Sequence, residues 1–80
     1  MIKVLFFAQV RELIETDELQ CELYPTVEAL RAALAERGGK WALALETGKL
    51  LAAVNQTLVE FTHPLQVGDE VAFFPPVTGG

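Results

Sequence analysis

The last ten residues of the chain, VAFFPPVTGG (Val71–Gly80), decide how the rest of the sequence folds around them. The apolar run before the two prolines predicts a strand. Pro75 and Pro76 end that strand, because proline fixes φ and has no N–H to donate to a neighbouring strand. The six residues after Phe74 span about 20 Å when extended at roughly 3.3 Å each. The pattern therefore predicts a folded domain of residues 1–74 and an extended C-terminal arm of residues 75–80.

The end of this arm carries one group with distinctive chemistry, the α-carboxylate of Gly80. Gly79 and Gly80 add no side-chain width, so the end of the arm fits a narrow channel and adopts backbone angles closed to other residues. A terminal carboxylate with a pKa of about 3.3 to 3.7 is ionised and inert at neutral pH. It reacts only after activation, for example as a mixed anhydride with a nucleotide phosphate. Two terminal glycines by themselves are more often a frayed chain end, so the interpretation depends on the rest of the sequence.

Length, charge and cysteine content restrict the class of protein. The 80 residues make one domain, and the net charge of −5 argues against a nucleic-acid partner, which would require a basic surface. The single cysteine allows no internal disulfide, and no apolar run approaches the length of a membrane span. We expect a cytoplasmic protein that acts on protein partners. The sequence has no zinc-ligand spacing and no phosphate-binding glycine loop.

Hydrophobic periodicity and turn residues predict the order of the elements. Strands are expected at residues 2–7, 19–24, 50–54, 57–61 and 70–74, and helices at residues 8–14, 26–37 and 41–45. Thr26 is the expected cap of the longest helix, the pair Gly38-Gly39 its end, and Gly48 a break before the third strand. The order predicts an α+β roll, in which a mixed sheet of about five strands is covered by one main helix. The last strand is expected in the middle of the sheet, parallel to the first.

Alternation along the strands predicts which side chains leave the core. Ile2, Val4 and Phe6 share one side of the first strand, and Val71 and Phe73 share the corresponding side of the last. The opposite side then carries a patch of apolar residues that face solvent. Its members are Leu5, Phe7, Leu58 and Phe74. Single exposed apolar residues are common, but a patch of several on neighbouring strands more often marks a protein interface. Phe74, a member of this patch, lies at the root of the arm.

Three further residues are of types that can take part in catalysis or partner binding. Cys21 alternates with Leu19 and Leu23, which predicts that its side chain points toward the core. We therefore interpret it as a small buried hydrophobic residue and not as a reactive thiol. His63 precedes Pro64 and has no second ligand or carboxylate in its pattern, so it is interpreted as a turn residue. Arg11 on the first helix is a candidate partner-binding residue, although an exposed salt-bridge donor is the commoner role.

Three segments carry a resemblance to a known family: MIKVLFFA (1–8), LAAVN (51–55) and GDEVAFFPPVTGG (68–80). Together they resemble the small subunits of molybdopterin synthase over essentially the whole chain. The run FFPPVTGG is specific to that family, whereas the final Gly-Gly is shared with the wider set of ubiquitin-like sulfur carriers.

The resemblance implies a β-grasp fold and a role as sulfur donor in molybdenum cofactor biosynthesis. It implies that an ATP-dependent activating enzyme adenylates Gly80, and that sulfur from a separate sulfurtransferase then gives a thiocarboxylate. Pro75, Pro76, Val77, Thr78 and Gly79 would thread this end into the large synthase subunit, where the sulfur attacks cyclic pyranopterin monophosphate. Two deliveries would build the dithiolene of molybdopterin. The implied assembly is a heterotetramer with two large subunits at its centre, and this chain would bind no cofactor or metal and have no autonomous active site.

Other functions share parts of this pattern. A ubiquitin-like modifier would use the same activation to join Gly80 to lysines. A plain interaction domain would leave the tail idle. The sulfur carrier of thiamine thiazole synthesis is a chemical relative, but the Pro-Pro-Val-Thr segment and the length of the chain argue against it.

Overall fold

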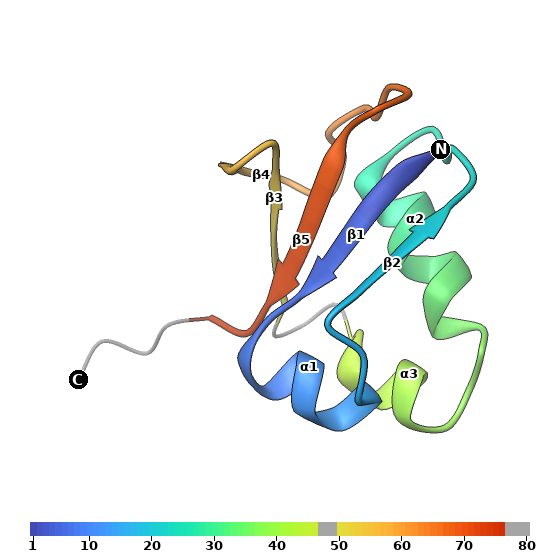
Figure 1. Cartoon of the computed structure of the whole chain (residues 1–80), viewed down its shortest axis with the longest axis vertical. Coiled ribbons are helices and arrows are strands. Elements are labelled where there is room, and N and C mark those ends of the chain that lie inside the picture. The colour runs from blue at the N-terminus through green and yellow to red at the C-terminus, as the bar shows by residue number, and fades with distance from the viewer. Residues whose placement is uncertain (47–49, 77–80) are drawn as a thin grey trace.

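The computed structural model describes residues 1–46 and 50–76, which form five strands and three helices. In chain order these are β1 (Ile2–Phe6), α1 (Ala8–Ile14), β2 (Glu18–Cys21), α2 (Val27–Ala35), α3 (Lys40–Ala44), β3 (Leu51–Val54), β4 (Thr57–Val59) and β5 (Glu70–Phe74). The strands make one mixed sheet in the order β2-β1-β5-β3-β4 (Figure 1). The predicted break at Gly48 lies outside the described residues.

The parallel pair β1 and β5 lies in the middle of the sheet, as predicted. Val4 is the register partner of Val71, and Phe6 is the partner of Phe73. The other three strand pairs are antiparallel. The first and last strands of the folded domain therefore lie side by side and run in the same direction, and Val71, Ala72 and Phe73 of β5 have register partners on both sides.

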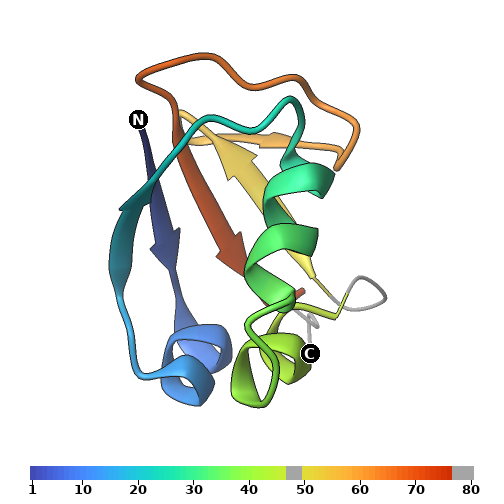
Figure 2. The ribbon, with the colours of Figure 1, turned by 90° about the vertical axis from the view of Figure 1, so that its right-hand side faces the viewer.

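One face of the sheet packs against α2 and forms the core (Figure 2). The inward side chains of β1 and β5 are almost completely buried, which confirms the predicted alternation. The rings of Phe6 and Phe73 stack with centroids 6.3 Å apart. From the helix, Val27, Leu30 and Leu34 close the core. The helices α1 and α3 lie together at one end of the sheet, and no described helix covers its other face (Figure 2).

The main helix is held at its N-terminus by side chain and backbone together. The Thr26 hydroxyl accepts a hydrogen bond from the Ala29 N–H at 3.1 Å, as the sequence predicted. The carbonyls of Phe61 and His63 accept from the N–H groups of Glu28 and Val27 at 2.9 and 3.1 Å. These bonds satisfy N–H groups that the first turn of a helix leaves without partners. The chain after β4 thus serves as a backbone cap for α2.

This backbone cap explains why β4 is shorter than predicted. The strand was expected to reach Phe61 but ends at Val59. Beyond that point the chain turns toward α2, and the His63 N–H donates to the Glu60 carbonyl at 3.0 Å. The backbone of Phe61 bonds to the helix instead of to a strand. His63 is a turn residue, as expected.

The second strand also ends earlier than predicted, at Cys21 instead of Tyr24. Cys21 pairs with Ile2, the first residue of β1, so β1 has no further residue with which residues after Cys21 could pair. Leu23, which was expected inside with Leu19 and Cys21, is therefore exposed. β1 similarly ends at Phe6, one residue before its predicted end.

Two residues on the helices also depart from their predicted faces. Helical spacing along residues 26–37 places Arg37 on the same stripe as Leu30 and Leu34, which predicts that it faces the sheet, but it is exposed beyond the end of α2. Its guanidinium lies 4.5 Å from the centroid of the Trp41 ring, a cation–π contact. Val10, Leu13 and Ile14 share helical spacing in the sequence, which predicts one common face for them, yet only Val10 and Ile14 are buried.

No helix in residues 1–46 and 50–76 combines the length and the apolar composition that crossing a bilayer requires.

We predict that Phe73→Ala lowers the free energy of unfolding by about 3 to 5 kcal/mol, because it opens a cavity in the centre of the core. Urea unfolding followed by circular dichroism measures this loss. Phe7→Ala is the matched control, since Phe7 is exposed on the opposite face, and it should cost much less. Equal losses in the two variants would contradict the assignment of the faces.

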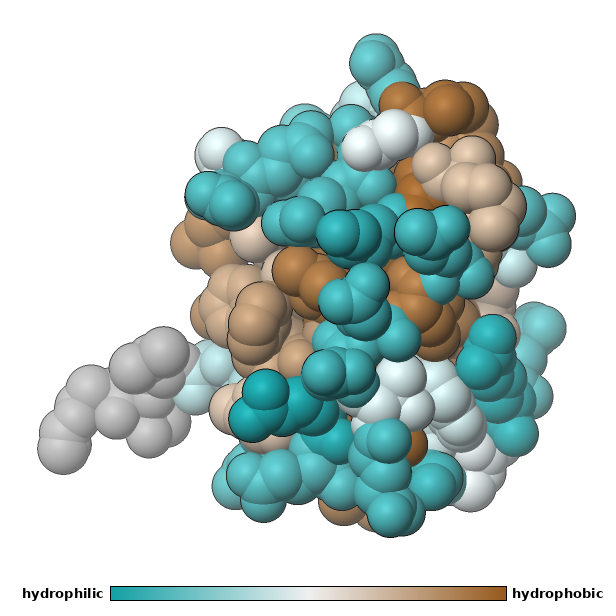
Figure 3. All heavy atoms as spheres, viewed as in Figure 1, coloured by the Kyte–Doolittle hydropathy of each residue, from teal (hydrophilic) through white to brown (hydrophobic). Residues whose placement is uncertain are grey.

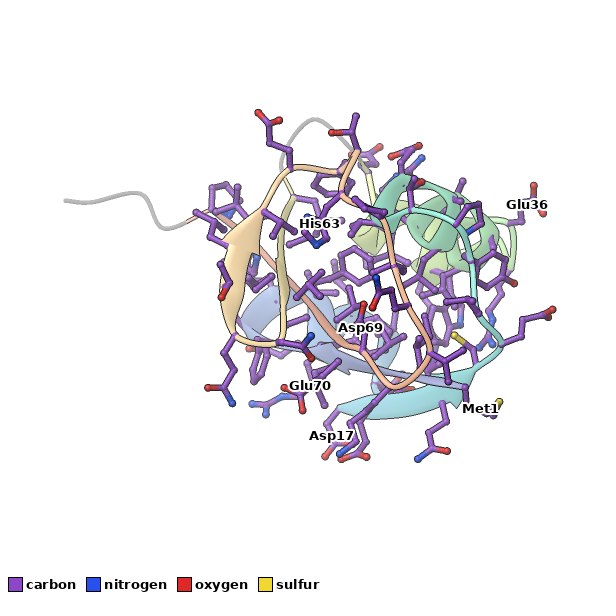
Figure 4. The ribbon with its side chains drawn as sticks, turned by 90° about the horizontal axis from the view of Figure 1, so that it is seen from above. Met1, Asp17, Glu36, His63, Asp69 and Glu70 are labelled. Atoms are coloured by element: carbon purple, nitrogen blue, oxygen red, sulfur yellow. The ribbon has the colours of Figure 1, made fainter. Side chains whose placement is uncertain are left out.

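A second prediction concerns pH and the polar end of the sheet, where Asp69 precedes β5 (Figure 4). Its carboxylate accepts hydrogen bonds from the Gln66 N–H at 2.8 Å and from Asn55 Nδ2 at 3.0 Å. The Gln66 bond, then the Asn55 bond, lowers the pKa of Asp69 in the folded protein. A lowered folded-state pKa stabilises the fold above the unfolded pKa of about 3.9, and this stabilisation is lost as the pH falls through the folded-state value.

Asp69→Asn should therefore reduce the free energy of unfolding at pH 6 to 7, and its difference from the wild type should shrink on acidification below about pH 4. Unfolding curves over a pH series test this, with the exposed Asp17→Asn as control. A difference that stays constant with pH would show that the charge of Asp69 does not contribute.

Candidate functional site

The candidate site is the uncovered face of the sheet together with the arm that leaves it. Register places its side chains in rows, because residues directly opposite each other on paired strands share a face. One row runs across four strands through Leu5, Ala72, Ala53 and Leu58. The next row joins Leu51 to Phe74 by register. The Phe7 N–H donates to the Phe73 carbonyl at 3.1 Å, which brings Phe7 beside this row.

We call this surface the outer apolar face. It comprises Leu5, Phe7, Leu51, Ala53, Leu58, Ala72 and Phe74. In Figure 3, tan and brown surface gathers over the sheet on the left of the view and is bordered by teal surface above and below. All four residues predicted for the patch lie on this face.

The centre of the outer apolar face is a hollow of about 390 Å³. Ala53 and Ala72 form its floor, where small side chains leave space, and Leu5, Phe7 and Phe74 form its apolar walls. Gln56 and Glu70 close the hollow toward the polar end of the sheet. A hollow of this shape suits a protruding apolar side chain of a partner protein.

Leu58 belongs to the same face but not to this hollow. It is 64% exposed on the edge strand β4 and lines a neighbouring hollow of about 430 Å³ with Leu51 and Phe61. Ala53, its register partner, connects the two hollows. The structure thus joins Phe7, Leu5 and Phe74 closely and places Leu58 at one side.

Leu51 is a member of the outer apolar face that the sequence interpretation missed. It is the register partner of Phe74 and lines the hollow beside Leu58. Ala52 and Val54 are buried in the structure, so alternation along 51–54 turns Leu51 and Ala53 outward. The run reads as uniformly apolar, which hides this alternation.

The turn from β1 into α1 positions Phe7 at the edge of this face. Ala8 has φ 53°, in the left-handed region that residues other than glycine rarely adopt. Because the chain turns so sharply, Phe7 stays with the sheet while Val10, three residues later, is buried. The first helix itself follows its predicted bounds.

Arg11 lies on α1 and is exposed. It lines neither of the two hollows, and it makes no ion pair with any residue of 1–46 and 50–76. Its role in partner binding stays a prediction.

The arm begins where β5 ends, at Phe74. Pro75 is half-buried and Pro76 is exposed. Val77, Thr78, Gly79 and Gly80, to which the arm and its reactive end were assigned, lie outside the described residues. Their role therefore stays a prediction that rests on the sequence.

The thiol of Cys21 offers no alternative site of sulfur chemistry. The side chain packs against the core and is half-buried. Burial raises the pKa of this thiol, and the opposing effect of Arg37 is smaller. A raised pKa disfavours the thiolate, which is the reactive form.

Solved structures define the class of protein to which this fold and face belong. A putative molybdopterin converting factor subunit 1 from Pyrococcus furiosus is 29% identical, with a TM-score of 0.75 over 95% of this chain and 97% of that one. A second match is a chain in the protein–protein complex of subunits 1 and 2 of molybdopterin-converting factor from Helicobacter pylori. It is 26% identical, with a TM-score of 0.69 over 99% of this chain and 97% of that one. The chain is a ubiquitin-like β-grasp protein.

Sequence comparison defines the family within this class. The ThiS family profile matches residues 4–80. Molybdopterin synthase sulfur carrier subunits from Escherichia coli and Haemophilus influenzae are 72% and 60% identical, each over the full length of both chains. The chain belongs to the family of molybdopterin synthase sulfur carrier subunits.

Proposed function

We propose that this chain carries sulfur as a thiocarboxylate on Gly80 and donates it to cyclic pyranopterin monophosphate in the active site of a large synthase subunit. The observation that carries the proposal is the 72% identity over full length to a molybdopterin synthase sulfur carrier subunit. The outer apolar face supports it, because this surface lies at the root of the arm and offers a docking site that an isolated protein does not need.

Activation of Gly80 would proceed in two steps, neither of which needs a catalytic group on this chain. An activating enzyme would join the carboxylate to the AMP part of ATP, with release of pyrophosphate. A sulfurtransferase persulfide would then attack the acyl carbon, so that a C–S bond forms and AMP leaves. A thiol reductant cleaves the remaining S–S bond and leaves the thiocarboxylate, whose sulfur is a stronger nucleophile than the carboxylate oxygen.

The folded domain would supply binding, and the arm would supply reach. An extended arm of six residues spans about 20 Å, enough to carry Gly80 into the interior of a partner whose surface contacts the outer apolar face. Acid, base and substrate-binding groups would belong to the large subunit, and two such subunits would form the centre of a heterotetramer. The chain would then act as a co-substrate in the cytoplasm, with no cofactor of its own and with ATP consumed by the activating enzyme.

The identities of the relatives favour this function over the alternatives. Both full-length relatives carry the synthase name, which argues against a carrier for thiazole synthesis. A ubiquitin-like modifier would use the same fold and the same activation, so a chemical test must separate it from a carrier. An interaction domain with an idle tail is tested by removal of Gly80.

We expect the intact mass of the chain, after incubation with activating enzyme, ATP and a sulfur source, to rise by the difference between one sulfur and one oxygen atom. The reason is replacement of one carboxylate oxygen on Gly80. A chain that lacks Gly80 is the control and should support no molybdopterin formation. Lysine-linked adducts without the sulfur gain would favour the modifier, and full activity of the shortened chain would favour the interaction domain.

Phe74→Ala should weaken binding to the large subunit by about 2 kcal/mol or more, which is roughly a 30-fold rise in Kd, because Phe74 walls the central hollow. Isothermal titration calorimetry with the carboxylate form measures this change. Val67→Ala is the control, since Val67 is an exposed apolar residue before β5, at the opposite end of that strand. An unchanged Kd for Phe74→Ala would remove Phe74 from the interface.

A further inference from the structure

A second apolar cluster surrounds the first residue of the arm, away from the outer apolar face. Leu13 on α1 is 42% exposed and Leu43 on α3 is 59% exposed. Both line a hollow of about 130 Å³ between the two helices, together with Pro75 and the polar residues Gln9 and Glu46. Val10 and Ala44 form its buried base. Two exposed leucines from different helices thus meet around one proline.

The path of the chain explains why Pro75 lies there. The parallel strands β1 and β5 leave the sheet together, and the Phe7 N–H bond to the Phe73 carbonyl is the last bond between them. The chain of β1 then turns at Ala8 into α1, and Figure 1 shows the end of β5 beside the start of this helix. Proline has no N–H to donate, so the ladder with β1 ends before Pro75, and the half-buried Pro75 lines the hollow between the two helices.

The direction of the chain at Pro75 matters because the arm is long. Proline fixes its own φ and restricts the preceding residue to extended angles, so two prolines in succession make a stiff segment. Because the arm spans at most about 20 Å, the direction of Pro75 and Pro76 limits the region that its tip can reach. A misplacement of 1 Å can already slow a reaction by about a hundredfold. Contacts that fix the direction of the chain at Pro75 can therefore affect the rate of transfer more than their small number suggests.

We propose that the hollow between α1 and α3 is a seat for Pro75 that sets the direction in which the arm leaves the domain. Leu13 and Leu43 are then positioning residues for sulfur transfer, distinct from the residues of the outer apolar face that dock the partner. This inference rests on the proposed function. It separates two tasks at one junction, since Phe74 faces the partner and Pro75 faces the helices.

The matched variants are Leu13→Ala and Leu23→Ala, because the two leucines are 42% and 43% exposed and only Leu13 lines the seat. With thiocarboxylated carrier and saturating large subunit, Leu13→Ala should slow single-turnover sulfur transfer about tenfold. Its Kd for the large subunit should change less than twofold, and Leu23→Ala should match the wild type in both. Leu43→Ala should behave like Leu13→Ala, and Leu13→Met should restore most of the rate.

A wild-type single-turnover rate in both alanine variants would overturn the proposal, as would a rise in Kd that accounts for the slower transfer. A second measurement is independent of sulfur chemistry. In the isolated protein, nuclear Overhauser contacts should join the Pro75 ring protons to the methyl groups of Leu13 and Leu43. Their absence would rule out the seat, whereas their presence with no sulfur transfer by the wild type would contradict only the proposed function.

Discussion

The parallel pairing of β1 with β5 is the constraint on which the rest of the structure depends. It joins the beginning of the chain to the end of the folded domain, and it buries Val4, Phe6, Val71 and Phe73 against α2. The same register brings Phe7 beside Phe74 on the opposite face. The core and the outer apolar face are therefore two sides of one ladder. A shift of one residue would exchange them, so packing of the core also fixes the position of the outer apolar face.

Much of this arrangement could be predicted because it follows from local patterns. Alternation in β1 and β5 indicated which side chains face the core, and the Pro-Pro pair fixed where the last strand ends. Thr26 was recognisable as a cap from its position before a helical stripe. The central place of β5 followed from the fold class. Phe7, Phe74 and Leu5 were predictable as a cluster for the same reason, since register between two strands determines their neighbours.

The features that escaped prediction depend on contacts between distant segments. β2 stops at Cys21 because β1 offers no further partner, and β4 stops at Val59 because the following carbonyls bond to the start of α2. Neither event leaves a mark in the local sequence. Leu51 was hidden inside an apolar run, and Leu13 shares the helical spacing of the buried Val10 and Ile14 although it is 42% exposed. Local patterns thus predicted the layers, whereas the ends of the strands and the surroundings of the arm required the assembled fold.

An exposed apolar face carries a risk of self-association, and the edges of this sheet limit it. An edge strand with free backbone groups can pair with another molecule, especially when it is long and apolar. Here β4 has three residues, and β2 carries exposed Glu18 and Gln20. The net charge of −5 adds repulsion between copies. Because both edges are poor templates for pairing, a partner of the proposed function would bind the outer apolar face instead, and it would meet the root of the arm at Phe74. Under the proposed function, docking in any other orientation would leave the arm without a recipient, so the position of the apolar residues would favour partners that can also accept the chain end.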